Sequence, residues 1–319
     1  MTVMAEAQLE QRLAELRAAE FIYEQPALAD TEYVFKHALT QEVAYNSLLI
    51  ERRKQLHERA GNALESLFAD QLDDHLTQLA DHYSHSDNID KAVKYLGRTG
   101  QQAMQRSAHI YAISSLSTAI DLLQKLPDSP ERTQRELLLQ LAVGPAFIPV
   151  KGWGAPEVER ASTRARKLCE RLGNPPELFS AMYRVWVVRH VRAELRSALE
   201  VAEQLWQRAE SSQDPVLLQL AHHALGETLF HRGRLQLARE HHVVALSLDD
   251  PKRPMGPFAI DEKVVNLSYM GWIQWWLGYP DQAVESCNEA IKAAKVLSHP
   301  QAWPSQMGML VQFLDFAAK

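Results

Sequence analysis

Residues 226–245 read GETLFHRGRLQLAREHHVVA, and residues 271–290 read GWIQWWLGYPDQAVESCNEA. Both stretches place two glycines and two alanines at successive intervals of 7, 5 and 7 residues. Small side chains at these offsets let two antiparallel helices cross closely, with the second glycine at the turn between them. The spacing therefore predicts two helix-turn-helix repeat units, with the structural positions Gly226, Gly233, Ala238, Ala245, Gly271, Gly278, Ala283 and Ala290.

The two copies are offset by 45 residues in the sequence. This offset is larger than the period of roughly 34 residues that is typical of a tetratricopeptide unit. The excess equals the length of residues 249–259 (DDPKRPMGPFA), a stretch rich in proline and glycine that lies between the copies. We predict a loop inserted at 249–259 between two otherwise standard units.

Apolar residues recur at helical spacing over most of the chain after residue 40, and the alternation typical of strands is almost absent. Prolines and glycines divide this pattern into helices of ordinary length. Two degenerate repeat copies are visible upstream, one at Ala80, Tyr83, Ala92 and Leu96, the other at Gly100, Ala112 and Ala119. The fold class that we predict is all-α, a tetratricopeptide-like helical-repeat solenoid (α-α superhelix).

The first 50 residues have a different pattern. A helical stripe of leucines leads to the apolar run 21–23, then to a polar turn with Pro26 and Asp30, and then to the apolar run 33–35. Two short apolar runs around a turn predict a β-hairpin, and a helix followed by a hairpin is typical of the latter half of a winged helix. We therefore expect a partial winged-helix segment and a chain truncated at its start.

These patterns divide the chain into four expected parts. The parts are a partial winged-helix segment with a short hairpin at 1–50, helical repeats at 51–130, degenerate repeats in helical hairpins at 131–212, and tetratricopeptide-like repeats with the inserted loop at 213–319.

Composition and charge narrow the classes of function. The formal net charge is −6, and a net acidic surface does not attract a polyanion, so we expect no nucleic acid partner. The two cysteines, Cys169 and Cys287, lie in helical patterns, and we expect reduced structural thiols in a cytoplasmic protein. The N-terminus has no signal-peptide core, and the most apolar stretch, 264–279, is too short to span a membrane.

Several segments, taken in order, carry a family resemblance. They are YVFKHALTQEVAYNSLL at 33–49, Arg52-Arg53 and Leu56-His57, then Leu126-Pro127-Asp128 with Glu131-Arg132, Lys151-Gly152-Trp153, Arg171-Leu172-Gly173, and LGYPDQA at 277–283. The chain from about residue 6 resembles the C-terminal region of bacterial adenylate/guanylate cyclase proteins that carry an AAA-type signal-transduction (STAND) ATPase module and a tetratricopeptide tail. The resemblance implies that the cyclase and the nucleotide-binding modules precede this region.

The sequence contains none of the common catalytic signatures. It has no GxxxxGK[ST] phosphate loop, no HExxH or CxxC metal spacing and no GxSxG turn. The repeat register already explains the glycines at 226 and 233, which have the interval of some phosphate loops. We therefore predict no catalytic, cofactor-binding or metal-binding residue, no cofactor, and a chain that is not itself an enzyme.

Histidines offer the main alternative to this interpretation. The pairs His222-His223 and His241-His242, with His231 between them, are spaced so that two helices of one hairpin could surround Zn²⁺. We favour a structural role, in which His222 and His242 occupy packing positions and their neighbours are exposed. A smaller group, Asp81, His82 and His85, is interpreted as a capping or surface group.

Two further interpretations concern binding surfaces. His37 lies in the segment that resembles the cyclase proteins, so it either contacts their ATPase module or packs as a structural histidine. Trp272, Trp275 and Trp276 are a possible partner surface, with packing inside the repeats as the alternative. A winged helix also suggests DNA binding, but the candidate recognition helix at 7–20 has three glutamates against two arginines, which disfavours phosphate contact.

The predicted function is a noncatalytic helical-repeat segment for protein interaction and regulation, resembling the tail that regulates a cyclase-ATPase signalling protein. Its expected partner is a protein or peptide ligand, the resemblance makes an ATPase/cyclase module one candidate for that partner, and we expect no membrane partner. The alternatives are a metal-dependent enzyme that uses the histidine pairs, and a winged-helix DNA-binding regulator with a repeat sensor domain.

Overall fold

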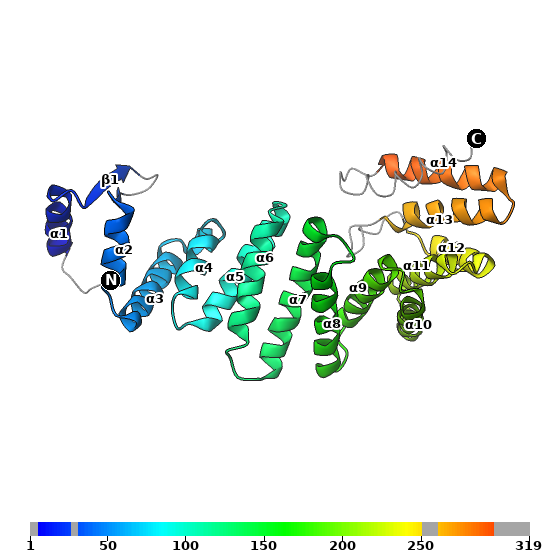
Figure 1. The fold of residues 1–319 in the computed structure, drawn as a ribbon, viewed down its shortest axis with the longest axis horizontal. Helices are drawn as coiled ribbons and strands as arrows, with labels where there is room; N and C mark the ends of the chain where they lie inside the picture. Colours follow the sequence, from blue (N-terminus) through cyan, green and yellow to red (C-terminus); the bar gives the residue numbers. More distant parts are fainter. Residues whose placement is uncertain (1–5, 27–30, 251–260, 297–319) are drawn as a thin grey trace. The chain divides into compact units, whose positions relative to one another are not determined.

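The computed structural model describes residues 6–26, 31–250 and 261–296, and these are almost all helical (Figure 1). Most of the predicted loop at 249–259 and the end of the chain after 296 lie outside the described residues. The elements in chain order are α1 (Glu6–Ala18), β1 (Ile22–Pro26), β2 (Thr31–Phe35), α2 (Ala38–Asn46), α3 (Ile50–Leu67), the 3-10 helix η1 (Ala69–His75), α4 (Leu76–Ser84), α5 (Ile89–Gln105), α6 (His109–Leu123), α7 (Pro130–Lys151), α8 (Pro156–Arg171), α9 (Glu177–Val191), α10 (Leu195–Ser212), α11 (Pro215–His231), α12 (Leu235–Ser247), α13 (Glu262–Trp276) and α14 (Pro280–Val296).

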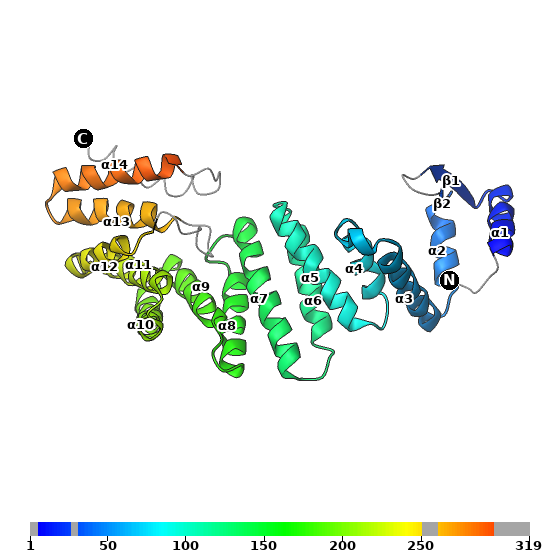
Figure 2. The ribbon, with the colours of Figure 1, turned by 180° about the vertical axis from the view of Figure 1, so that it is seen from behind.

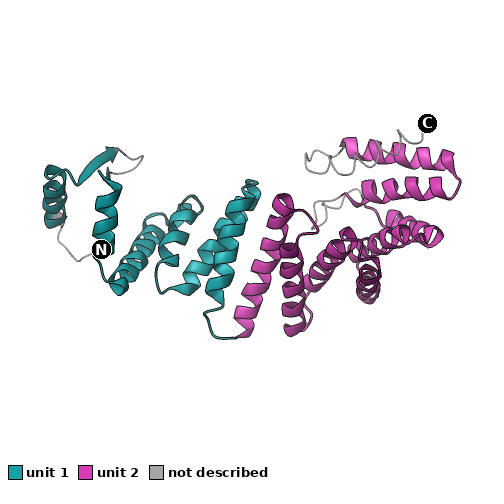
Figure 3. Cartoon of the chain, viewed as in Figure 1, with its two compact units in different colours: residues 1–128 teal, residues 129–319 magenta. Residues whose placement is uncertain are grey.

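The chain divides into two compact units (Figure 3). Unit 1 is Met1–Asp128 and unit 2 is Ser129–Lys319. The division falls at the PDSP stretch, where Ser129 caps α7 by accepting a hydrogen bond from the Arg132 amide at 3.1 Å. A proline at the first position of α7 suits this start, because its missing N–H needs no partner there. The finer division into four parts stays a prediction.

Unit 1 begins with the predicted hairpin. Strands β1 and β2 pair antiparallel, with Ile22 opposite Phe35 and Pro26 opposite Thr31. In the described part of residues 6–50, Ile22 is the one buried residue. Helices α3 to α6 then pack each against the next, so the hydrophobic interior of unit 1 lies among these helices.

Unit 2 is built of consecutive helix pairs, and the views from the front and from behind both show α13 and α14 side by side (Figures 1 and 2). Helix α11 packs on α12, its partner in the hairpin, and also on α9 and α13, the first helices of the neighbouring pairs. One apolar cluster joins α7 to α11 and includes Leu137, Leu168, Trp186 and Leu205. Because α11 has neighbours on several sides, residues on more than one of its faces are buried.

The repeat glycines and alanines lie where α11 crosses α12 and α13 crosses α14. A Cβ on Gly226 would come within 2.8 Å of the His242 ring, and a Cβ on Gly271 would clash with the Cys287 sulfur. Gly233 and Gly278 have φ values of +72° and +86°, which only glycine adopts without strain. The four alanines that complete the rhythm are fully buried: Ala238, Ala245, Ala283 and Ala290.

Candidate functional site

The three tryptophans predicted as a partner surface have different environments. Trp272 and Trp275 are half-buried and pack against the apolar cluster that contains Leu267 and Ala283. Trp276 is 60% exposed at the end of α13. Of the three, Trp276 is the side chain that offers a large free apolar surface.

The structure corrects the prediction for the histidine pairs. His242 is fully buried against Gly226, as expected for a packing position. On α11, however, His223 is the buried residue, whereas His222 is only half-buried. His241 is half-buried rather than exposed, and its Nδ1 lies 2.9 Å from Nδ1 of His222. The prediction assumed one buried face for α11, but the helix packs mainly on α10 and α12 and also on α9 and α13.

The most concentrated set of polar side chains in unit 2 surrounds the Glu227 carboxylate on α11. Glu227 Oε1 lies 3.0 Å from Nε2 of His190 on α9, and Glu227 Oε2 lies 3.0 Å from Nε2 of His223. The hydroxyl of Tyr269 on α13 donates a hydrogen bond to Glu227 Oε1 at 2.7 Å. One carboxylate therefore links three helices that belong to three successive pairs. We call Glu227, His190, His223 and Tyr269 the Glu227 cluster.

Further polar groups extend the Glu227 cluster toward α12 and α13. His223 Nδ1 lies 3.7 Å from a carboxylate oxygen of Glu262. His242 Nδ1 is 2.7 Å from the amide oxygen of Asn266, so this nitrogen carries the proton and donates. The His242 ring also stacks on Tyr269, with 5.3 Å between the ring centroids. Buried polar groups on four helices are thus tied together by hydrogen bonds and close ion pairs.

Burial and charge set the protonation states in this cluster. Burial acts to lower the pKa of His223, but the carboxylates of Glu262 and Glu227 outweigh it and raise that pKa to about 9. For Glu227, burial acts to raise the pKa, and the hydrogen bonds from His190 and His223 outweigh it and hold the pKa well below its usual value. Burial raises the pKa of Glu262. At neutral pH, His223 is therefore a buried cation between carboxyl groups.

His242 has the opposite protonation behaviour. Burial, followed by the positive charge of His223, lowers the pKa of His242 to about 3. Because the folded pKa is below the unfolded value of 6.5, the unfolded chain binds more protons between these two pH values. The stability contributed by neutral His242 is therefore present above about pH 6.5 and is lost as the pH falls toward 3.

We expect His242→Gln to flatten the acid limb of the stability profile. In the natural chain, the His242 contribution to the free energy of unfolding should fall by up to about 1.4 kcal/mol for each pH unit below 6.5. The glutamine amide can still donate to Asn266 but does not titrate. Urea unfolding at a series of pH values measures the difference between the two proteins. Parallel profiles for the two would contradict this assignment.

A second histidine group lies on α3 and α4 in unit 1. The predicted residues Asp81, His82 and His85 are joined by His57 of α3, whose Nδ1 is 3.0 Å from Nδ1 of His82. His85 Nδ1 lies 2.9 Å from the Asp81 carbonyl oxygen, near the end of α4. The ring of His57 stacks on that of His85. This is the surface group that the sequence indicated. His57 is the additional member, and the spacing along α4 could not predict it because His57 lies on another helix.

His37 does not pack as a structural histidine. It is exposed, directly before α2, and its side chain makes no capping hydrogen bond. The structural alternative in the prediction for this residue is therefore wrong. The other alternative, contact with an ATPase module, stays a prediction.

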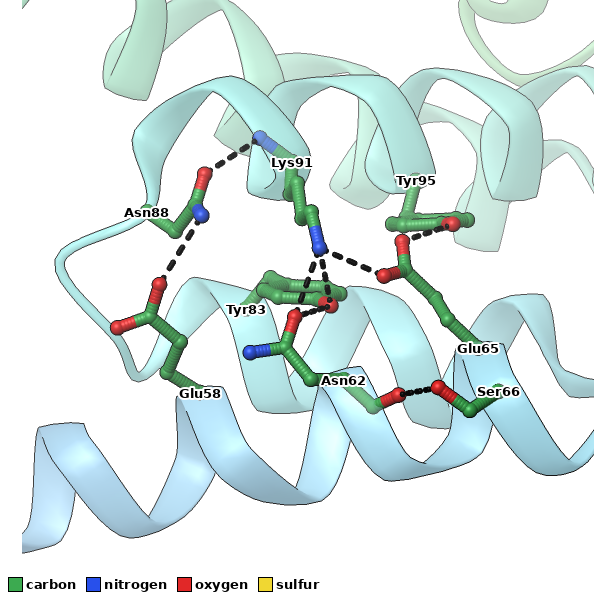
Figure 4. Close-up of polar contacts among 8 residues, drawn as sticks. All are labelled: Glu58, Asn62, Glu65, Ser66, Tyr83, Asn88, Lys91 and Tyr95. Carbon is green, nitrogen blue, oxygen red and sulfur yellow. Dashed lines mark hydrogen bonds and ion pairs between the residues drawn. The ribbon is translucent and has the colours of Figure 1, made fainter.

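A polar network in unit 1 joins α3 to α4 and α5 (Figure 4). Lys91 Nζ donates to Glu65 Oε2 at 2.6 Å and to Asn62 Oδ1 at 2.7 Å. The hydroxyls of Tyr83 and Tyr95 donate to Asn62 and Glu65 respectively. Because these polar groups are partnered by one another, the network holds the helices together and leaves little reason to invoke a ligand.

Both cysteines are buried and unpaired. Burial raises the pKa of each thiol to about 11, so neither is a thiolate near neutral pH. Cys287 fills the space beside Gly271 and Cys169 belongs to the core of α7 to α11, which is the structural role that the sequence predicted.

Among the described residues, no helix combines the length and apolar character needed to cross a bilayer. The most apolar stretch of the sequence forms α13, whose buried residues include Asn266 and Ser268.

Comparison with known proteins places the fold but no family. No family model matches the chain. An uncharacterized protein of Rhizobium meliloti is 27% identical over 228 residues, which cover 70% of this chain. The chain spans only 22% of that relative's length.

Solved structures match over much longer stretches at low identity. The apo form of the quorum sensor NprR from B. thuringiensis is 13% identical, with 98% of this chain and 82% of that chain covered and a TM-score of 0.57. The apo form of RapI is 14% identical, with coverage of 71% and 83% and a TM-score of 0.54. The chain has a tetratricopeptide-like helical-repeat fold. NprR in complex with its cognate peptide NprX gives 15% identity, coverage of 98% and 78%, and a TM-score of 0.52.

The prediction of an all-α helical-repeat fold is thereby confirmed. Sequence reasoning missed the Glu227 cluster, although two signals were present. His223 and Glu227 are four residues apart and so share a helix face, and Asn266 interrupts an otherwise apolar helix. The partner His190 is 37 residues away in the sequence from Glu227 and is brought close only by the packing of α9 on α11.

Proposed function

We propose that this chain is a noncatalytic helical-repeat segment that binds a protein or peptide and regulates a signalling module of the cyclase-ATPase class. Residues 6–50 would contact the ATPase module, and the repeats that follow would bind the ligand. The observation that carries the proposal is the large amount of exposed apolar surface on residues 6–50.

This segment buries almost none of its large apolar side chains. Leu39 and Val43, four residues apart on α2, are 70% and 62% exposed. The hairpin residues Phe21 and Tyr23 and the residue Leu49 after α2 are also exposed. Several large apolar side chains exposed in one segment are typical of an interface with another protein.

The resemblance of residues 33–49 to the cyclase proteins supports the identity of the partner. In those proteins the matching segment directly follows the ATPase module, so the exposed face of α2 is where the module would pack. The length of the Rhizobium meliloti relative, of which this chain spans about a fifth, leaves room for such a module.

The repeat fold supports the second half of the proposal. Stacked helix pairs expose a continuous surface along their helices, which suits an extended ligand. The structure of NprR with its cognate peptide matches this fold over nearly all of the present chain. At 15% sequence identity, the similarity concerns the fold alone. Trp276 is the exposed aromatic side chain that we assign to this ligand surface.

The size of the native polypeptide and the protection of α2 test the proposal. An antibody against this chain should detect a band far larger than 36.2 kDa in extracts of the source. In that larger polypeptide, hydrogen exchange at the amides of residues 38–49 should be slow, and Leu39→Ser with Val43→Ser should accelerate it.

The matched control is Ile110→Ser, which removes a side chain of similar exposure from α6. This variant should leave exchange at residues 38–49 unchanged. A native band at the mass of this chain alone would contradict the proposal, as would equal exchange in the double variant and the unaltered polypeptide.

A further inference from the structure

We propose that His190, Glu227 and His231 form a binding site for a divalent transition metal ion, with Zn²⁺ as the expected ion. The site lies between α9 and α11, and its ligand set differs from the histidine pairs that the sequence indicates. One potential ligand atom from each of the three residues lies within 4.8 Å of the other two.

The distances suit a small tetrahedral site. Zn²⁺ bonds to nitrogen and oxygen ligands at about 2.0 to 2.2 Å, so tetrahedral ligand atoms stand roughly 3.3 Å apart. Nε2 of His190 and Oε1 of Glu227 are already 3.0 Å apart. The ring of His231 already meets the ring of His190 edge-on, with 4.7 Å between the ring centroids.

The hydrogen bond of His231 leaves the correct nitrogen free. Nδ1 of His231 lies 3.0 Å from the carbonyl oxygen of Glu227, one turn earlier on α11. A carbonyl only accepts, so Nδ1 carries the proton and Nε2 presents a lone pair. Fixing of the tautomer by an Nδ1–H bond to a backbone carbonyl is the arrangement found around metal-bound histidines.

His190 is nearly enclosed, and one of its two nitrogens has no partner. Its side chain is 8% exposed. Its Nδ1 is buried with no hydrogen-bond partner among the described residues. The polar interaction of this ring is therefore directed through Nε2 toward Glu227. Nε2 is thus the nitrogen of this ring that faces the carboxylate and would take the metal ion.

Groups behind the ligands hold the Glu227 carboxylate in position. The Tyr269 hydroxyl donates to Glu227 Oε1, and His223 Nε2 lies beside Oε2. These contacts hold both oxygens of the carboxylate. Outer partners of this type orient metal ligands in proteins and raise the affinity.

The donor set favours Zn²⁺ over harder ions. Two imidazoles and one carboxylate suit Zn²⁺ and related transition metals, whereas Ca²⁺ and Mg²⁺ prefer sites made of oxygen atoms. Three protein ligands leave the fourth position of a tetrahedral ion for water or a ligand group. Because His231 is exposed, the ion can enter from solvent on this side.

The test uses the tag-free chain after removal of metals with a chelator. Zn²⁺ is titrated in competition with a chromogenic chelator, and Co²⁺ is added separately to record the visible absorption of a tetrahedral site. We expect one Zn²⁺ per chain. His231→Asn, which changes an exposed side chain, should weaken Zn²⁺ binding at least tenfold while circular dichroism stays unchanged.

The matched controls are His222→Asn and His85→Asn, which alter the two other histidine groups of the chain. Both variants should bind Zn²⁺ as the natural chain does and give the same Co²⁺ spectrum. The proposal is overturned if the natural chain binds no stoichiometric Zn²⁺, if His231→Asn binds it unchanged, or if either control loses it.

Discussion

Replacing Glu227 with alanine should lower the free energy of unfolding of the metal-free chain by about 3 to 5 kcal/mol. The substitution leaves the His223 cation buried, with Glu262 at 3.7 Å as its remaining carboxyl partner. It also takes the acceptor from the Tyr269 hydroxyl, which is buried in the same cluster. Leaving a buried charge without its partner is among the most destabilising single changes.

Urea unfolding followed by far-ultraviolet circular dichroism measures this effect, with chelator present throughout. Tyr269→Phe is the matched control, because it removes one hydrogen bond to Glu227 and leaves the charges in place. That variant should cost only about 1 kcal/mol. A loss below about 1 kcal/mol for Glu227→Ala would show that the cluster contributes little to folding.

The second large effect is expected for Trp186→Ala. Trp186 is 2% exposed in the core that joins α7 to α11, and its indole Nε1 donates to Thr228 Oγ1 at 2.9 Å. Truncation removes most of a buried aromatic ring and leaves a cavity, which typically costs about 3 to 5 kcal/mol. Thermal and urea unfolding should both show the loss.

Trp276→Ala provides the control for the same residue type. Trp276 is exposed, so its truncation should change the free energy of unfolding by less than about 0.5 kcal/mol. Similar losses for the two variants would mean that Trp276 packs in solution. That result would also remove it from the proposed ligand surface.

The repeat architecture was predictable because its signal is local. Gly226 and Gly233 report a close crossing and a turn within one hairpin, and their spacing repeats at Gly271 and Gly278. The hairpin of the first 50 residues was likewise indicated by two short apolar runs. Features of this type depend on neighbours that are close in sequence, which is where a sequence is most informative.

The Glu227 cluster was not predictable, because it depends on which faces of α11 are covered. Sequence periodicity indicated one buried stripe for each helix, so His222 rather than His223 was assigned to packing. The position of α11 among α9, α10, α12 and α13 buries residues beyond a single stripe and brings His190 to Glu227. Single-sequence reasoning has no access to the pairing of helices that are distant in the chain.

Helix α7 shows that prolines in the sequence do not always mark the end of a helix. It continues through Pro145 and Pro149 to Lys151, although prolines in the helix interior remove hydrogen bonds and usually end a helix. Residues on both sides of Pro145, such as Val143 and Ala146, are buried, so the helix is packed against its neighbours before and after the proline. Tertiary contacts thus outweigh a local breaking signal here.

The contacts of Glu227 with α9 and α13 mean that the helix pairs of unit 2 are not interchangeable, because each interface needs particular side chains. In arrays of near-identical repeats, units can be duplicated, deleted or exchanged because each interface is like the next. Here the pair α11/α12 supplies an acid that its neighbours on each side must match with an imidazole and a phenol. Loss or duplication of that pair during evolution would leave a buried charge without its partner. We therefore expect unit 2 to evolve by single substitutions rather than by gain or loss of whole repeats.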